Sequence, residues 1–229
     1  MNPLRRHFTL TATALAIASA LASLPARADD ATDAKGIVAK ATVTVNAFAA
    51  DKDYASLPGQ LAKAKAVLVY PQIIEGGFII GGSGGTGVLL VRDEKTGSFS
   101  APAFYSMGGI SLGFLAGGQA AEVLLLINSQ NALDSMLSTK VKLGGNASYA
   151  VGPKGAGQGS TMNADIVSYS KAKGAYASMA LDGQVIDVRE SLNAAYYGKP
   201  ASPVDILVRS SVSNPDAAPL QAALKAVAR

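Results

Sequence analysis

The sequence predicts an α+β fold, in which helices at the N- and C-terminal ends pack on a central, curved, mostly antiparallel β-sheet. Helical patterns occupy residues 29–63 and 191–228, with one short helix between them. The middle of the chain holds about seven short apolar strands, without the strand–helix alternation that builds a parallel sheet. Many of the 24 glycines fall in this middle part. Because glycine permits sharp coiling, the sheet is expected to be strongly curved and even barrel-like.

The first 28 residues have the features of a cleavable targeting segment. Arg5 and Arg6 are followed by an apolar run from Leu10 to Leu24, and Ala26-Arg27-Ala28 supplies a small-x-small cleavage pattern. The two arginines are compatible with a twin-arginine signal and equally with an ordinary secretory signal. We therefore expect a signal peptide at 1–28, a single domain at 29–229, and export to the periplasm or cell envelope.

The amino-acid composition argues against several classes of partner, catalytic site and metal site. Removing these 28 residues from the 229 leaves 201, with 17 basic and 16 acidic side chains, since three of the 20 basic residues lie in the segment. A net charge of +1 provides no general field for nucleic acid, so no nucleic-acid partner is expected. The chain has no cysteine, and its single histidine, His7, also lies in the segment. Histidine-containing triads, cysteine nucleophiles and nearly all zinc sites are thereby excluded from the mature protein.

Two helices are predicted at the start of the mature chain. The first helix is predicted from Asp29 to Asp51, because its residues Ile37, Ala41, Val45 and Phe48 fall on one apolar stripe. The acids at its start suit the helix dipole. A shorter helix runs from Ser56 to Lys63, with Ser56 as a candidate cap and a proline in the first turn.

Strands follow from residue 66 onward. Ala66 to Tyr70 is a buried strand that Pro71 is expected to end. Further strands are predicted at 78–81, 87–92, 98–100, 110–115, 123–127 and 147–151, with a short helix at 131–138 and a glycine-rich loop at 153–160. Residues 96–121 carry no charge, but Pro102, five glycines and a strand-like alternation argue against a membrane-spanning helix.

The C-terminal third predicts three more strands and then helices. Strands at 166–170, 175–181 and 185–189 are expected to form a meander, with a hairpin turn at Asp182-Gly183. A helix at 191–197 should end at Gly198, and further helices are expected at 203–208 and 217–228.

The glycine-rich stretch from Gly76 to Val91 contains a G-x-G-x-x-G pattern at residues 82–87. A dinucleotide site needs a helix after these glycines, whereas Val88 to Val91 reads as a strand. Gly152 to Ser160 lacks the G-K-[ST] of a phosphate loop. No cofactor is predicted, and the glycines are interpreted as sites of close packing and curvature.

Catalysis is not expected, because the acids do not form a paired-carboxylate motif and Ser170 and Lys171 face opposite sides of a strand. The lysines, in contrast, come in close pairs. If the last two pairs, 140/142 and 171/173, are extended, the spacing of two puts both ammonium groups of each pair on one face of the sheet. Such pairs could meet lipid phosphates, or could simply keep edge strands soluble. The candidate lipid-binding residues are Lys63, Lys65, Lys140, Lys142, Lys171 and Lys173.

An ordered series of segments resembles the SYLF-domain family over about residues 36–208. It begins with the run from Leu61 to Pro71, and the series continues with Gly76-Gly77-Phe78, Gly81-Gly82, Gly87 to Leu90, Pro102-Ala103-Phe104, Gly108 to Ser111, Val123 to Asn128, Lys142-Leu143-Gly144, Val151-Gly152-Pro153, Ser168 to Lys171, Lys173-Gly174 and Tyr196-Tyr197-Gly198.

The resemblance implies a non-enzymatic module that binds anionic phospholipid headgroups at a membrane surface. Eukaryotic members of the family bind phosphoinositides, and some bind actin. An exported protein would meet neither as a rule, so a different anionic lipid is expected. The alternative is a structural or protein-interaction component of the cell envelope that has no direct lipid ligand.

Overall fold

A computed structural model describes the fold over most of the chain. The residues described are 26–77, 80–112, 117–138, 140–145, 148–152, 164–173, 181 and 183–229. The predicted targeting segment up to residue 25, the loop at 153–160 and most of the predicted strand at 175–181 lie outside these residues.

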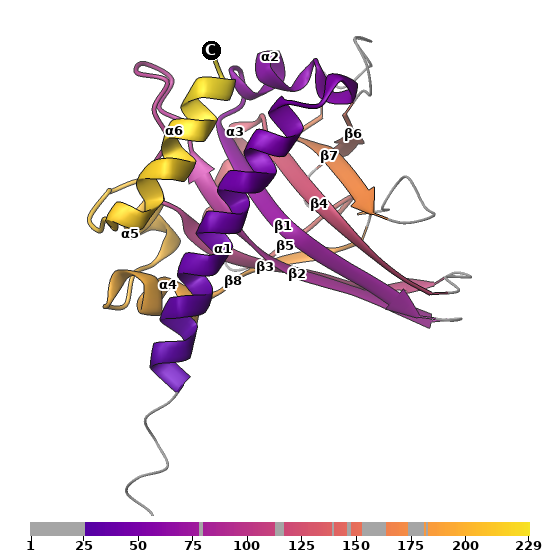
Figure 1. Ribbon diagram of the computed structural model, residues 1–229, viewed down its shortest axis with the longest axis horizontal. Coiled ribbons are helices and arrows are strands. Elements are labelled where there is room, and N and C mark those ends of the chain that lie inside the picture. Colours follow the sequence, from indigo (N-terminus) through magenta and orange to yellow (C-terminus); the bar gives the residue numbers. More distant parts are fainter. Residues whose placement is uncertain are drawn as a thin grey trace, which may run out of the picture.

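The described residues contain one eight-stranded sheet, curled into a half-barrel, with a layer of helices against one face (Figure 1). Neighbouring strands are antiparallel except β6 and β7, which are parallel. The strand order is β5-β8-β3-β2-β1-β4-β7-β6. The strands are β1 (Ala66–Gly77), β2 (Ile80–Val91), β3 (Ala103–Leu112), β4 (Gly117–Ile127), β5 (Lys140–Lys142), β6 (Tyr149–Val151), β7 (Ile166–Lys173) and β8 (Val185–Val188).

Helices come from both ends of the chain, as predicted, and α3 lies between the strands. The α+β class is therefore confirmed. The elements are α1 (Ala26–Ala49), η1 (Lys52–Tyr54), α2 (Leu57–Leu61), α3 (Gln130–Leu137), α4 (Glu190–Tyr197), α5 (Pro203–Leu207), η2 (Pro215–Ala217) and α6 (Ala218–Val227). Within the described residues, none of these helices is long and apolar enough to cross a membrane.

The long helix α1 packs across the sheet and contacts α4 and α6 beside it (Figure 1). Ala34, Val38, Ala41, Val45 and Phe48 are buried along one side of the helix. The predicted apolar stripe is confirmed, except that Ile37 is only half-buried at its margin. The β-branched residues Thr42 to Val45 disfavour a helix. The helix α1 forms nevertheless, because tertiary packing of the buried stripe outweighs helix propensity.

The sheet separates two apolar cores. One lies between the sheet and α1, α2, α4 and α6, and it includes Val67, Val88 and Phe104. The other lies on the opposite face, where α3 and α5 cover Leu68, Leu89 and their neighbours. Because successive residues point to opposite faces, the runs 66–70 and 123–127 are buried at every position, which accounts for their unbroken apolar sequences.

The prediction that Pro71 ends the first strand is wrong. β1 continues to Gly77, and its register with both neighbours shifts between Val69 or Tyr70 and Ile73. Pro71 therefore lies in a bulge, where a residue without an N–H does not interrupt the ladder of hydrogen bonds.

The two strands predicted on either side of the glycines at 82–86 are instead one strand, β2. The G-x-G-x-x-G pattern lies inside this strand, so it forms no phosphate-binding turn. A Cβ at Gly87 would overlap the carbonyl oxygen of Val69 and lie 2.6 Å from the Tyr70 ring. Glycine is thus required here by close packing against the β1 bulge, as the sequence interpretation expected.

The predicted meander is also wrong. β7 pairs with β4 and β6, whereas β8 pairs with β3 and β5, close to the opposite edge of the sheet. Both sides of β8 are occupied at Val185 to Asp187, by β3 and by β5. The C-terminal helix ends were predicted well: Gly198 ends α4 with φ of 71°.

Candidate functional site

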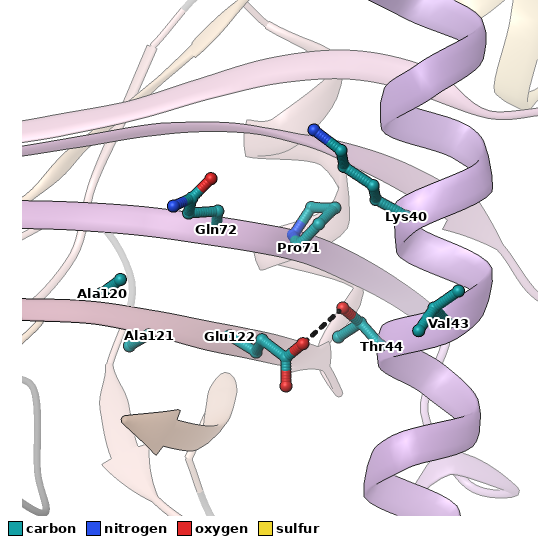
Figure 2. Close-up of a pocket in the computed structure, with 8 residues that line it drawn as sticks. All are labelled: Lys40, Val43, Thr44, Pro71, Gln72, Ala120, Ala121 and Glu122. Atoms are coloured by element: carbon teal, nitrogen blue, oxygen red, sulfur yellow. Dashed lines mark hydrogen bonds between the residues drawn. The ribbon is translucent and has the colours of Figure 1, made fainter. Parts of the chain in front are cut away.

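A pocket opens where α1 crosses the bulge of β1, and its volume is about 300 Å³ (Figure 2). The bulge turns Pro71 and Gln72 toward α1, and β4 forms the floor beside them. The lining residues are Lys40, Val43, Thr44, Pro71, Gln72, Ala120, Ala121 and Glu122.

The basic and acidic side chains lie on opposite sides of the pocket. Lys40 extends from α1 over Pro71, on the same side as the Gln72 amide (Figure 2). On the other side, buried Thr44 donates its hydroxyl to Glu122 Oε1 over 3.4 Å. Lys40 is exposed, and it forms no ion pair within the described part of the chain. The pocket therefore has an ammonium group without an ion pair and a neutral amide on the same side, two groups that suit a phosphate or another oxyanion.

One exposed aliphatic side chain lines the pocket, and a second lies on β1 opposite a lining residue. Val43 lines the pocket and is 66% exposed, and Ile74 is 58% exposed. Ile74 lies opposite Ala120, another lining residue, in the ladder between β1 and β4. Exposed aliphatic side chains around a lysine are typical of surfaces that enter the headgroup region of a bilayer.

Below the pocket, carboxylates and Lys171 form a local network. Lys171 Nζ lies 2.6 Å from Asp51 Oδ2, and Lys171 is directly opposite Glu122 on β4. Tyr54 donates its hydroxyl to the Ser170 carbonyl over 2.5 Å. Burial, followed by the charges of Asp51 and two other acids, raises the pKa of Tyr54. This network fixes the end of α1 to β7.

The structure confirms one expectation about the paired lysines. Lys140 and Lys142 are both exposed while Val141 between them is buried, so the pair shares one face of β5. Lys140 is bound to Asp187 at 3.2 Å, however, and β5 forms the edge of the sheet far from β7. Lys171, as described above, is held by Asp51.

In the pair Lys63 and Lys65, only Lys65 forms an ion pair with a described residue. Lys65 lies 2.8 Å from Glu94, and its hydrogen bond and charge lower the pKa of that carboxyl. Lys63 is exposed and forms no ion pair with any described residue. The side chain of Lys173 lies outside the described residues. The sheet order thus places the three pairs apart, and three of the six lysines already hold a carboxylate.

Sequence reasoning did not select Lys40, since the residue is remarkable only through its position beside the β1 bulge. A proline inside a strand was the available signal, because a strand that continues past a proline must bulge there. With Pro71 interpreted as the strand end, the pocket could not be predicted.

A model of the Ysc84 family, described as "Las17-binding protein actin regulator", matches residues 108–227, which is more than half of the chain. The chain belongs to the Ysc84 (SYLF) family. The resemblance drawn from the ordered sequence segments is thereby confirmed. No solved structure matches the chain.

Three similar proteins illustrate the reach of this SYLF relationship. The chain is 31% identical to LAS seventeen-binding protein 3 of Saccharomyces cerevisiae over 148 residues, covering 62% of this chain and 32% of the relative. It is 30% identical to Protein YSC84 of the same yeast over 148 residues, covering 62% and 31%. It is 30% identical to SH3 domain-containing YSC84-like protein 1 of Mus musculus over 152 residues, covering 64% and 44%. The matched region is thus less than half of each relative's length.

Proposed function

We propose that this SYLF protein binds anionic phospholipid headgroups at a membrane surface of the cell envelope and catalyses no reaction. The observation that carries the proposal is the pocket at the β1 bulge, where the exposed ammonium of Lys40 lies beside the Gln72 amide. Exposed Val43 lines the same pocket, and exposed Ile74 lies on β1 opposite its lining residue Ala120. The cation and amide would hold the phosphate, while the aliphatic side chains enter the headgroup layer.

The six lysines selected from the sequence take a secondary part in this proposal. Lys63 and Lys142 are exposed and carry no carboxylate among the described residues, so they would add long-range attraction to an anionic surface. Lys65, Lys140 and Lys171 would first have to leave their acidic partners. We accordingly rank Lys40 above them. We also propose that the segment at 1–28 directs export, and that residues 29–229 act as a single domain in the periplasm.

Vesicle co-sedimentation tests the proposal. We expect the protein to sediment with phosphatidylglycerol vesicles at low salt and to remain in solution with phosphatidylcholine vesicles. Because each charge near an anionic surface contributes about 1 kcal/mol, and Lys40→Glu replaces a positive charge by a negative one, the substitution should weaken binding by roughly 5- to 30-fold. Lys225→Glu is the matched control, since Lys225 is equally exposed but lies on α6. Equal loss in both variants, or no sedimentation of the unaltered protein, would contradict a specific site at Lys40.

A second candidate is a protein-interaction component of the envelope without a lipid ligand. The description of the family and the name of one relative, LAS seventeen-binding protein 3, refer to binding of a protein, Las17. In this chain, the short edge strand β6 exposes Val151 (61%), which gives a partner strand an apolar contact. Recovery of one envelope protein at fixed stoichiometry, together with no vesicle binding, would favour this candidate.

A further inference from the structure

A row of polar residues crosses the sheet on the face opposite α1. Glu75 on β1 lies directly opposite Ser83 on β2 and Gln119 on β4, and Ser83 lies opposite Gly109 on β3. Residues that face each other across strands point to the same side of a sheet. On β8, the pairing of Gly108 with Val185 brings Gln184 beside Gly109.

Gly109 allows the Gln184 side chain to lie in this row. A Cβ at Gly109 would lie only 2.6 Å from Gln184 Oε1, so the amide rests on the bare backbone of β3, in the row position opposite Ser83. Two residues further along the strands, Ile73, Met107 and Ala121 belong to the apolar core on this face. The polar row therefore forms the boundary between that core and the ends of the long strands.

The row is buried, but most of its acceptors are not used. Glu75, Gln119 and Gln184 are 6%, 9% and 4% exposed. Gln119 Nε2 donates to Glu75 Oε2 over 2.7 Å. Among the residues that the structure describes, Ser83 Oγ, Gln119 Oε1 and Gln184 Oε1 have no hydrogen-bond partner. Buried polar atoms normally have one, so three free acceptors in one row indicate a missing donor group.

Charge indicates the kind of donor. Glu75 forms no ion pair in the described part of the chain. A buried carboxylate is costly unless a cation compensates it. A divalent metal would require more carboxylates, and no group of three or more metal-binding side chains of the His, Cys, Asp or Glu types occurs among the described residues. A singly charged group with several N–H donors matches one carboxylate and neutral oxygens.

We propose that this row binds a primary ammonium group. Glu75 supplies the compensating charge, and its carboxylate, Ser83 Oγ and Gln184 Oε1, which occupy three neighbouring positions of the row, accept the three N–H donors, while Gln119 holds Glu75 through its Nε2. The ammonium can belong to a free small amine or to the ethanolamine headgroup of a phospholipid. The row faces away from the Lys40 pocket, and this binding does not depend on the proposed binding of anionic lipid.

Calorimetric titration with free ethanolamine tests the chemistry. We expect saturable binding to the protein, and no binding of ethylene glycol, which lacks the charge, or of choline, which lacks N–H donors. Glu75→Gln should weaken ethanolamine binding by about tenfold or more, because it removes a charge-assisted hydrogen bond. Glu190→Gln, at an exposed acid on α4, is the control and should bind as the unaltered protein does.

If Glu75→Gln does not fold, as judged by circular dichroism, Ser83→Ala decides, since it retains the carboxylate and should weaken binding several-fold. Vesicles then distinguish the sources. Sedimentation that rises with the phosphatidylethanolamine fraction and falls in the variant assigns the lipid headgroup, and ethanolamine binding without that dependence assigns a free amine. Absence of saturable ethanolamine binding, or equal affinity in the variants, would overturn the proposal whatever the result with anionic vesicles.

Discussion

The four long strands β1 to β4 are built differently along their two halves. Near the helices, residues such as Leu68, Val88 and Leu125 are fully buried, and both faces of the sheet carry a core. Beyond the β1 bulge, the same strands are rich in glycine, and Ile74 and Ile110 are 58% and 80% exposed. The hydrogen-bonded ladder continues through both halves. One half thus has an apolar core on both faces, whereas the other exposes large aliphatic side chains on one face and buries a polar row on the other.

The pocket lies at the border between these two halves. The bulge at Pro71 and Gln72 shifts the register without breaking the sheet, and α1 crosses β1 close to this point (Figures 1 and 2). We interpret the border as the place where a rigid scaffold presents a site to its ligand.

The largest predicted effect is a difference in the free energy of unfolding between substitutions in the two halves of β3. Phe104→Ala removes a fully buried ring and should lower the free energy of unfolding by about 3–5 kcal/mol. Ile110→Ala on the same strand should change it by about 0.5 kcal/mol or less. Urea unfolding measures both values. Similar losses in the two variants would show that the glycine-rich half is also packed against something.

A smaller effect should appear within β2, between two glycines that differ in their surroundings. Gly87→Ala places a methyl group against Val69 and Tyr70 and should destabilise the protein by about 1–3 kcal/mol. At Gly84, the nearest atom to a new Cβ is the Met107 carbonyl oxygen at 3.7 Å, so Gly84→Ala should be neutral or slightly stabilising. Thermal unfolding of the pair checks this. A stable Gly87→Ala variant would mean that close packing does not explain the glycine there.

The smallest predicted effect is a change in vesicle binding without a change in the free energy of unfolding. Ile74→Ser should leave the unfolding transition unchanged but weaken sedimentation with phosphatidylglycerol vesicles by a few-fold, because part of an exposed aliphatic side chain no longer enters the headgroup layer. Val151→Ser on β6 is the matched control, at a similar exposure of 61%. An equal decrease in both variants would remove Ile74 from the proposed contact surface.

The sequence predicted the elements whose signals are local. The apolar stripe of α1, the buried run 66–70 and the glycine that ends α4 each depend on neighbours a few residues away, and all three are confirmed. The α+β class followed from their order. The helix boundaries agree to within a few residues, since capping and periodicity are local properties.

The errors concern long-range pairing. Pro71 is tolerated because β1 bulges between two partners, and β8 leaves its sequence neighbour β7 to pair with β3 and β5. Neither arrangement has a signal within a few residues. The candidate site depends on such an arrangement, because Lys40 and Gln72 meet only when α1 crosses the bulge. The paired lysines were visible as a spacing, but their acidic partners Asp51, Glu94 and Asp187 lie far away in the chain.

The most direct test of the central claim is a nuclear magnetic resonance titration of the isotope-labelled protein with a short-chain phosphatidylglycerol. We predict that the largest amide shifts occur at the pocket, at Lys40, Val43, Gln72 and Ala120, and that they disappear in Lys40→Glu. Shifts confined to the lysines of β5 and β7, or no saturable shifts in the described residues, would contradict the account.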